Sequence, residues 1–312
     1  MRYETDLFDL RMDTLLLRGW DLVALFNERT LRTRALCLRT AGLNVFRDKG
    51  LPDEPFRPKR MPAKLLRELP LAVDLDSLLI DGLTVKYHEK DTLSADFGEV
   101  VFNDIQARAT GLHTRATGDS ATVRLHVNAH VYGKAPIVLD LTTRIPDRTD
   151  HFSLHARIGA LPFQAFNRMT NDLILVKATA GTIGGIDYTL EADDDRAKGR
   201  VDIEYQGLVI DISKRDGSRE KNKLLSFLVN RIKHNDNLRS DPGFRHGDFA
   251  IERLKDRQIF NYTWRGLREG MLTSVMPKVV TTLQQATKPP LEKKVEREQR
   301  KAARAKKGKP VR

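Results

Sequence analysis

Three histidines are the residues whose types and spacing come nearest to a metal site. His126 and His130 fall on the same side of one predicted strand, and His155 lies on the same outer face of a later strand. Because four residues of a strand span roughly 13 Å, His126 and His130 are too far apart to share one metal ion. Outward polar residues of a sheet are ordinarily solvated, so we expect no metal site here.

The other candidates for chemistry have structural interpretations. The run Asp193–Asp195 lies between two predicted strands, where aspartate favours turns, and it lacks the ligand spacing of a calcium loop. Gly181 and the pair Gly184–Gly185 match no phosphate-binding motif and predict a bend or bulge in a strand. Cys37 is expected to be a small buried hydrophobe. We therefore predict no catalytic residues and no cofactor, and we expect a protein that is not an enzyme.

Alternation of apolar and polar residues is the clearest structural signal in the chain. Between Ala121 and Val131 every odd position is apolar and every even position is polar. Ile137–Ile145, Phe152–Ile158 and Ala197–Tyr205 repeat the pattern, and turn-forming residues separate these runs. One-sided alternation with short links is typical of long antiparallel strands that bury one face. The sequence therefore predicts a mainly β, α+β protein.

Earlier segments alternate less regularly. Leu78–Tyr87 changes phase at Gly82, which predicts a bulge there. Val100–Leu112 is a further expected strand, and we expect two more within Thr30–Arg47.

Four helices are expected beside the sheet. They are Trp20–Glu28, Leu161–Leu173, Asn222–His234 and a long amphipathic C-terminal helix over Gln258–Ala286, kinked at Pro277. The apolar stripe of the last helix could pack on its own sheet or dock a partner. It contains Phe260, Trp264, Leu267, Met271 and Val275.

The positive charge of the chain is concentrated in its C-terminal tail. Residues Lys288–Arg312 contain 11 basic and 3 acidic residues, and the whole chain carries +12. We expect a disordered tail, and a basic tail can bind nucleic acid, the anionic headgroups of a membrane surface or acidic proteins. The preceding part has no basic stripe interleaved with aromatics, so nucleic-acid binding is not expected. No stretch approaches the roughly 18 apolar residues of a transmembrane helix, and no secretory signal is recognised.

Six motifs in order resemble one protein family. They are LAVDLDSLLIDGLTVKYHEK (Leu71–Lys90), VVFNDIQA (Val100–Ala107), LPFQAFN (Leu161–Asn167), KGRVDIEYQGLVIDI (Lys198–Ile212), LLSFLVNRI (Leu224–Ile232) and FNYTWRGLREGM (Phe260–Met271). Together they resemble the C-terminal region of AsmA-like proteins, relatives of TamB, with a weaker similarity in Asp9–Lys49. The resemblance implies a sheet curled into a taco-like β-groove with an apolar lining. It also implies lipid transport and outer-membrane biogenesis in the cell envelope, with envelope proteins as partners of the tail and a periplasmic or inner-membrane-associated location.

These interpretations divide the chain into five parts. We expect an N-terminal β-rich segment (1–50), a proline-rich and basic connector (51–70), an antiparallel β-groove domain (71–256), the C-terminal helix (257–287) and the basic tail (288–312).

Two functions remain open from the sequence. The apolar face could hold phospholipid or another acyl-chain ligand, or the protein's own helices could fill it and leave a scaffold that docks a partner through its C-terminal helix and tail. The residues expected to line a lipid groove are Val123, Leu125, Val127, Val131, Ile137, Leu139, Leu141, Phe152, Leu154, Ile158, Val201 and Ile203.

Overall fold

The computed structural model describes residues 3–52, 55–90, 97–116, 121–168, 176–213, 222 and 235–275. The chain divides into two compact units, Met1–Val275 and Met276–Arg312, and the description below concerns the first. Three predictions lie outside the described residues. They are the helix from Asn222 to His234 apart from its first residue, the continuation of the C-terminal helix past Val275 with the kink at Pro277, and the basic tail.

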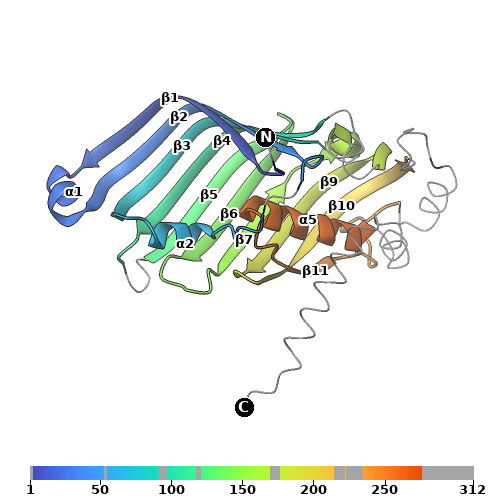
Figure 1. The fold of residues 1–312 in the computed structure, drawn as a ribbon. Coiled ribbons are helices and arrows are strands. Elements are labelled where there is room, and N and C mark those ends of the chain that lie inside the picture. Colours follow the sequence, from blue (N-terminus) through green and yellow to red (C-terminus); the bar gives the residue numbers. More distant parts are fainter. Residues whose placement is uncertain are drawn as a thin grey trace, which may run out of the picture. The chain divides into compact units, whose positions relative to one another are not determined.

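One large curled sheet of 11 strands dominates the structure (Figure 1). The strands are β1 (Leu7–Trp20), β2 (Thr30–Asp48), β3 (Ala72–Lys90), β4 (Phe97–His113), β5 (Thr122–Val131), β6 (Ala135–Arg144), β7 (Phe152–Ile158), β8 (Leu161–Pro162), β9 (Val176–Ala192), β10 (Arg196–Ile212) and β11 (Gly247–Glu252). Neighbouring strands follow the order of the sequence, and the short β8 pairs with β9 beside this path. The predicted mainly β fold is confirmed.

Among the described residues, three α-helices and one 3₁₀-helix accompany the sheet. They are α1 (Leu22–Glu28), α2 (Pro62–Arg67), α5 (Ile259–Val275) and the 3₁₀-helix η2 (Phe163–Phe166). Figure 1 shows α2 and α5 in front of the sheet, whereas α1 lies at the far end of β1 and β2. We call the face of the sheet that α5 covers the inner face.

Strand pairing is antiparallel throughout the described sheet, except between β2 and β3. These two strands run parallel, in register from Thr30 beside Ala72 to Asp48 beside Lys90. A parallel pair needs a crossover connection, and the segment that contains α2 supplies it. The residues predicted to form an N-terminal segment, 1–50, therefore share one sheet with 71–256. Thr30–Asp48 also forms one strand of 19 residues, where the sequence predicted two.

The helix predicted over Leu161–Leu173 is wrong over Leu161–Phe166, whereas Asn167 and Arg168 are α-helical. Leu161 and Pro162 pair with β9, and a 3₁₀ turn follows them. The buried Phe163 packs edge-on against Tyr205, with ring centroids 5.8 Å apart. Tertiary packing and strand pairing therefore override the local helical pattern at this point.

Residues with a left-handed backbone conformation lie beside one another on neighbouring strands of the curled sheet. Thr40 and Gly82 interrupt the β2–β3 register side by side, with φ of 46° and 75°. Asp104 has φ of 52° where the register of β4 with β5 shifts. The bulge predicted at Gly82 is confirmed, and so is the irregularity predicted at Gly181, beside which the β9–β10 register shifts. Bulges bend strands and increase their twist, so these positions help to curve the sheet.

Helix α5 lies directly against the C-terminal strands. A Cβ on Gly270 would come within 2.4 Å of Val201 Cγ2, and a Cβ on Gly266 within 2.7 Å of the Tyr188 hydroxyl. The backbone of α5 therefore reaches the sheet itself. The residues of the helix buried by this contact are Tyr262, Gly266, Gly270, Ser274 and Val275.

Candidate functional site: an apolar trough on the inner face

The strand register brings the predicted lining residues to one face. Leu125 lies beside Leu141, which lies beside Leu154, and Val127 lies beside Leu139 in the next row. The rows continue through Tyr188 to Val201 on β10. Because directly paired residues of neighbouring strands point to the same side, all twelve predicted lining residues share the inner face.

Burial divides the predicted lining into a covered part and a half-open part. Val201 and Ile203 are fully buried, and α5 lies over Val201. The other buried members are Val123, Val131, Ile137, Phe152 and Leu154. The half-buried members are Leu125, Val127, Leu139, Leu141 and Ile158. The protein's own helix therefore fills the inner face at β9 to β11, while the middle strands keep apolar surface accessible.

The same rows extend to strands whose apolar residues were not predicted as lining. Leu17 pairs with Leu36 and Leu15 pairs with Leu38, in the rows that lead through β3 and β4 to Leu125 and Val127. The exposed apolar residues that β1 places on this face are Phe8, Leu10, Met12, Leu15, Leu17 and Trp20. Half-buried residues of β2 and β3 continue the surface at Leu36, Leu38, Leu43, Leu78, Ile80, Leu83 and Val85.

A signal for β1 is present in the sequence. Phe8, Leu10 and Met12 alternate with polar residues, and the alternation resumes one position out of phase at Leu15. The change of phase lies beside the left-handed Thr40 of the neighbouring strand. The two alternating runs are therefore recognisable as one strand once the bulge is known. We call the inner-face surface of β1 to β7 that α5 leaves accessible the trough.

Helix α2 closes one end of the trough. Leu66 of α2 packs against a buried cluster of inner-face side chains that includes Leu75, Val123 and Ile145. Arg67 fixes the helix in place, because its guanidinium donates to the carbonyls of Ile145 and Asp147 and pairs with the buried Asp150 at 2.7 Å.

Buried charges occupy the other end of the trough. Arg47 lies two residues beyond the inner-face Val45, and it is paired with Glu4 at 2.8 Å and with Asp6 at 3.1 Å. Arg257, just before α5, also contacts Glu4 at 2.8 Å. These contacts tie the N-terminal residues, β2 and the start of α5 together at the ends of the strands.

Burial dominates the protonation behaviour of this charged end. It raises the pKa of Asp6, although the neighbouring Arg47 guanidinium acts in the opposite direction. Burial alone would lower the pKa of Arg47. The carboxylates of Asp6 and Glu4 act in the opposite direction, and the net result is a raised pKa. The pKa of the Tyr87 hydroxyl is raised by burial and by Glu89, to which it donates a hydrogen bond of 2.5 Å. The apolar trough therefore ends at a compact network of charges with little access to water.

Within α5, Val275 is the one member of the predicted partner stripe that belongs to the face docked on the sheet. Trp264, Leu267 and Met271 are half-buried and lie beside the contact face made by the small residues of α5. Phe260 is exposed, and its ring lies 5.4 Å from that of the inner-face Tyr87. Val275 is buried. The start of α5 thus borders the trough.

The outer face of the sheet carries polar side chains in pairs. His126 Nδ1 lies 2.7 Å from Asp140, and His155 Nε2 lies 3.1 Å from Asp187. Asp193 Oδ1 accepts hydrogen bonds from the N–H groups of the two residues that follow Asp194, which confirms the predicted turn. In the described ranges, no group of three or more histidine, cysteine or acidic side chains has the arrangement of a metal site.

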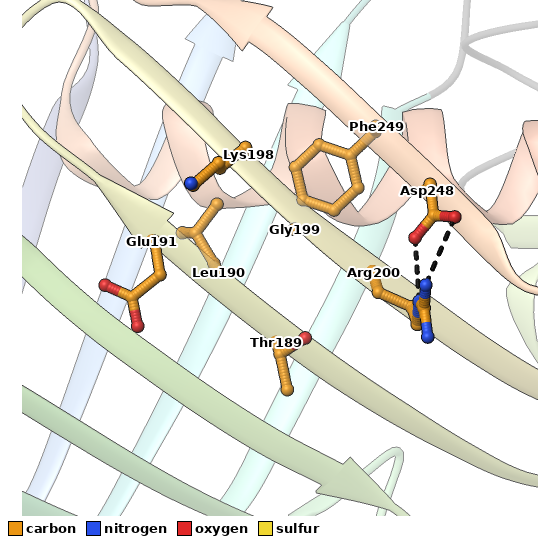
Figure 2. Close-up of a pocket in the computed structure, with 8 residues that line it drawn as sticks. All are labelled: Thr189, Leu190, Glu191, Lys198, Gly199, Arg200, Asp248 and Phe249. Carbon is orange, nitrogen blue, oxygen red and sulfur yellow. Dashed lines mark hydrogen bonds and ion pairs between the residues drawn. The ribbon is translucent and has the colours of Figure 1, made fainter.

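A shallow pocket of about 290 Å³ lies over β9 to β11 on the side away from α5 (Figure 2). Its most prominent contact is the ion pair of Arg200 with Asp248, at 2.7 Å. The hydrogen bond from Arg200 lowers the pKa of Asp248. The remaining lining residues are Thr189, Leu190, Glu191, Lys198, Gly199 and Phe249. The pocket is separate from the trough, and its two opposite charges already satisfy one another.

Within the described residues, no helix combines the length and the apolar character needed to cross a bilayer. Comparisons of the chain with protein-family models, with curated proteins and with solved structures give no match.

Proposed function

We propose that this chain is a non-enzymatic lipid-binding or lipid-transfer module that holds acyl chains in the trough. One observation carries the proposal. Exposed apolar side chains of β1 continue, row by row, into half-buried apolar side chains of β2 to β7 on a face that α5 covers mainly at β9 to β11.

The energetics favour an acyl chain as the occupant. Moving apolar carbon out of water is worth about 0.8 kcal/mol per methylene, so a chain laid along the rows gains affinity with each carbon buried. A row of aliphatic residues offers no directional contacts, which suits a ligand recognised by its hydrocarbon rather than by its polar groups. Phospholipid is the occupant that we propose. The resemblance to AsmA-like proteins adds the cell envelope, at the periplasm or the inner membrane, as the proposed location.

The test replaces exposed trough residues, so that folding is preserved. In the double variant Leu15→Asp/Leu17→Asp, two carboxylates enter the rows that lead to Val127 and Leu125. Because burying an unpaired carboxylate against hydrocarbon costs several kcal/mol, we expect the phospholipid that co-purifies with the protein to fall by about tenfold or more. Solvent extraction followed by phosphate and mass analysis measures it.

The matched control is Leu16→Asp. Leu16 lies between the two positions, pairs with Cys37 and points to the outer face, and its side chain is also exposed. This variant should retain the wild-type amount of lipid. Equal lipid content in the double variant and the wild type would rule out the trough as the lipid site.

A further inference from the structure

A second apolar surface adjoins the trough at the end of the sheet where α1 joins β1 to β2, and Trp20 lies at the border between the two (Figure 1). We call Trp20, Leu22, Val23 and Phe26 the α1 tip. All four side chains are exposed, and Phe26 is the most exposed large hydrophobic residue of the described part of the chain, at 77%. Scattered single hydrophobic residues are normal on a protein surface, but four within seven positions form a patch.

The tip is apolar on the side that points away from the body. Ala24 is completely buried and marks the side of α1 that faces the sheet. Leu22, Val23 and Phe26 lie at positions i, i+1 and i+4, which an α-helix places within an arc of about 100°. That arc lies opposite Ala24, so the three side chains project outward together.

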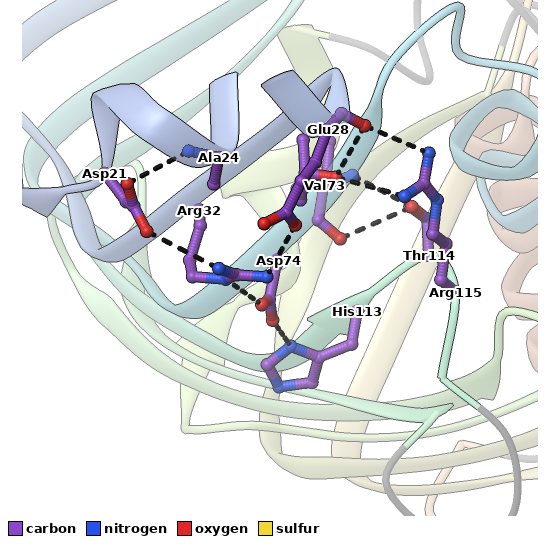
Figure 3. A network of polar contacts seen from close by, with 10 residues as sticks. Asp21, Ala24, Glu28, Arg32, Val73, Asp74, His113, Thr114 and Arg115 are labelled. Atoms are coloured by element: carbon purple, nitrogen blue, oxygen red, sulfur yellow. Dashed lines mark hydrogen bonds and ion pairs between the residues drawn. The ribbon is translucent and has the colours of Figure 1, made fainter. Parts of the chain in front are cut away.

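A polar network fixes the tip rigidly to the sheet (Figure 3). Arg32 contacts Asp21 at 3.4 Å, Glu28 at 3.2 Å and Asp74 at 3.0 Å, and so joins both ends of α1 to β3. Asp21 also caps the helix by accepting a hydrogen bond of 3.0 Å from the N–H of Ala24.

The neighbouring strand β4 completes this support. His113 Nδ1 lies 2.6 Å from Asp74, and the Arg115 guanidinium donates to Thr30 Oγ1 at 3.2 Å. A tip held in this way keeps its apolar side chains exposed without loss of order, so less conformational entropy remains to be lost when it binds.

The charges around the tip are positive once this network is accounted for. Residues 18–34 contain four arginines and two acidic residues. Both acidic residues and Asp74 of β3 pair with the single Arg32, and Arg115 belongs to the same network, so these five arginines and three carboxylates carry a net charge of +2. Arg18, Arg29 and Arg34 are exposed, and their side chains form no ion pair with any described residue. A projecting apolar arc flanked by free arginines is complementary to a bilayer with anionic headgroups.

We propose that the α1 tip docks the protein on an anionic membrane surface, with Val23 and Phe26 inserted among the acyl chains and Trp20 at the level of the headgroups. Tryptophan favours the boundary between headgroups and hydrocarbon, which suits its place at the base of α1. The proposal rests on the proposed function in one respect, because a lipid-carrying trough needs a membrane from which to load or to which to deliver.

The experiment follows Trp20 as a local reporter. The chain has two tryptophans, so Trp264→Phe leaves Trp20 as the single tryptophan, which is excited selectively over the tyrosines at long wavelength. The full-length protein is titrated with vesicles of phosphatidylcholine mixed with phosphatidylglycerol, in which the phosphatidylcholine is brominated on its acyl chains. Quenching of Trp20 reports contact of this residue with the brominated acyl chains, and the tip variant below separates entry of the tip from other routes to that contact. We expect strong quenching with these vesicles and little with brominated phosphatidylcholine alone.

Two variants in this background test the residues. Val23→Ser/Phe26→Ser should raise the lipid concentration needed for half-maximal quenching by about tenfold or more, because two inserted side chains are lost. The matched control is Phe56→Ser, since Phe56 is 73% exposed on the connector, away from the tip. Absence of quenching in the parent protein, or the same titration curve for the double variant and the parent, would overturn the proposal. Equal quenching by neutral vesicles would overturn the role of the arginines.

The two proposals fail in different ways. The tip variant should retain the co-purifying lipid of the wild type, whereas Leu15→Asp/Leu17→Asp should lose that lipid and still dock on anionic vesicles. Docking by a protein that carries no lipid would leave the tip proposal standing and remove the proposed function.

Discussion

The Arg47→Met variant loses about 3 to 5 kcal/mol of unfolding free energy at neutral pH, because one partner of a buried ion network has been removed. Arg47 and Asp6 are both largely buried, and Arg47 supplies the cation 3.1 Å from Asp6. Methionine occupies much of the space of the arginine methylenes but has no guanidinium. The carboxylate of Asp6 therefore loses its cationic partner. Glu4 keeps its ion pair with Arg257, so Asp6 is the carboxylate that is left without a cation.

The loss of stability in this variant should shrink in mild acid. Burial already raises the pKa of Asp6 in the folded protein, and removal of Arg47 takes away the main influence that lowers it. A carboxyl group whose folded pKa lies above its unfolded value binds its proton more tightly when folded. The variant therefore regains stability relative to the wild type as the pH falls through the raised pKa.

Urea unfolding of both proteins at pH 7 and near pH 5 measures the effect. The matched control is Arg11→Met, because Arg11 is exposed and contacts the exposed Asp9 on β1. An exposed pair of this kind is worth less than about 1 kcal/mol, so the control should change little at either pH. A loss for Arg47→Met that matched the control, or that was the same at both pH values, would contradict the buried network.

The Gly270→Val variant should lose about 3 kcal/mol of unfolding free energy, since its side chain enters the contact between α5 and the sheet. A Cβ at this position would lie 2.4 Å from Val201 Cγ2 and 2.9 Å from the carbonyl oxygen of Gly247. Valine is a better helix former than glycine, so helix propensity alone predicts a small gain in stability. A large loss can therefore be assigned to the displacement of α5.

Thr273→Val is the control for this substitution. Thr273 lies one turn further along α5 and is exposed, so valine there should change the unfolding free energy by less than about 0.5 kcal/mol. Chemical denaturation of the three proteins gives the comparison. If Gly270→Val were as stable as the wild type, the helix would not approach the sheet in the way described.

The sequence revealed the strands with the strictest alternation. β5, β6 and β7 alternate without interruption, and their predicted shared face is the inner face. The bulge at Gly82 was also readable, because a phase change inside an apolar pattern has a simple physical cause. Such features are local, since each depends on residues within a few positions of one another.

Other features depend on contacts between residues far apart in the chain. The parallel pairing of β2 and β3 is set by the course of the connector, which carries no pattern of its own. The charged end of the trough joins Glu4, Arg47 and Arg257, and nothing in their separate surroundings indicates that they meet. For α5, the apolar stripe was the obvious candidate for docking, but Gly266 and Gly270 allow a closer approach than the larger side chains do.

The central claim is that the trough holds lipid, and native mass spectrometry of the wild-type protein, purified without detergent, tests it most directly. The proposed function predicts a mass in excess of the polypeptide that corresponds to phospholipid in a fixed ratio, released by solvent extraction. A compact protein with the mass of the polypeptide alone would contradict the claim. That result would favour a scaffold whose own chain covers its apolar face and which docks a partner through its C-terminal helix.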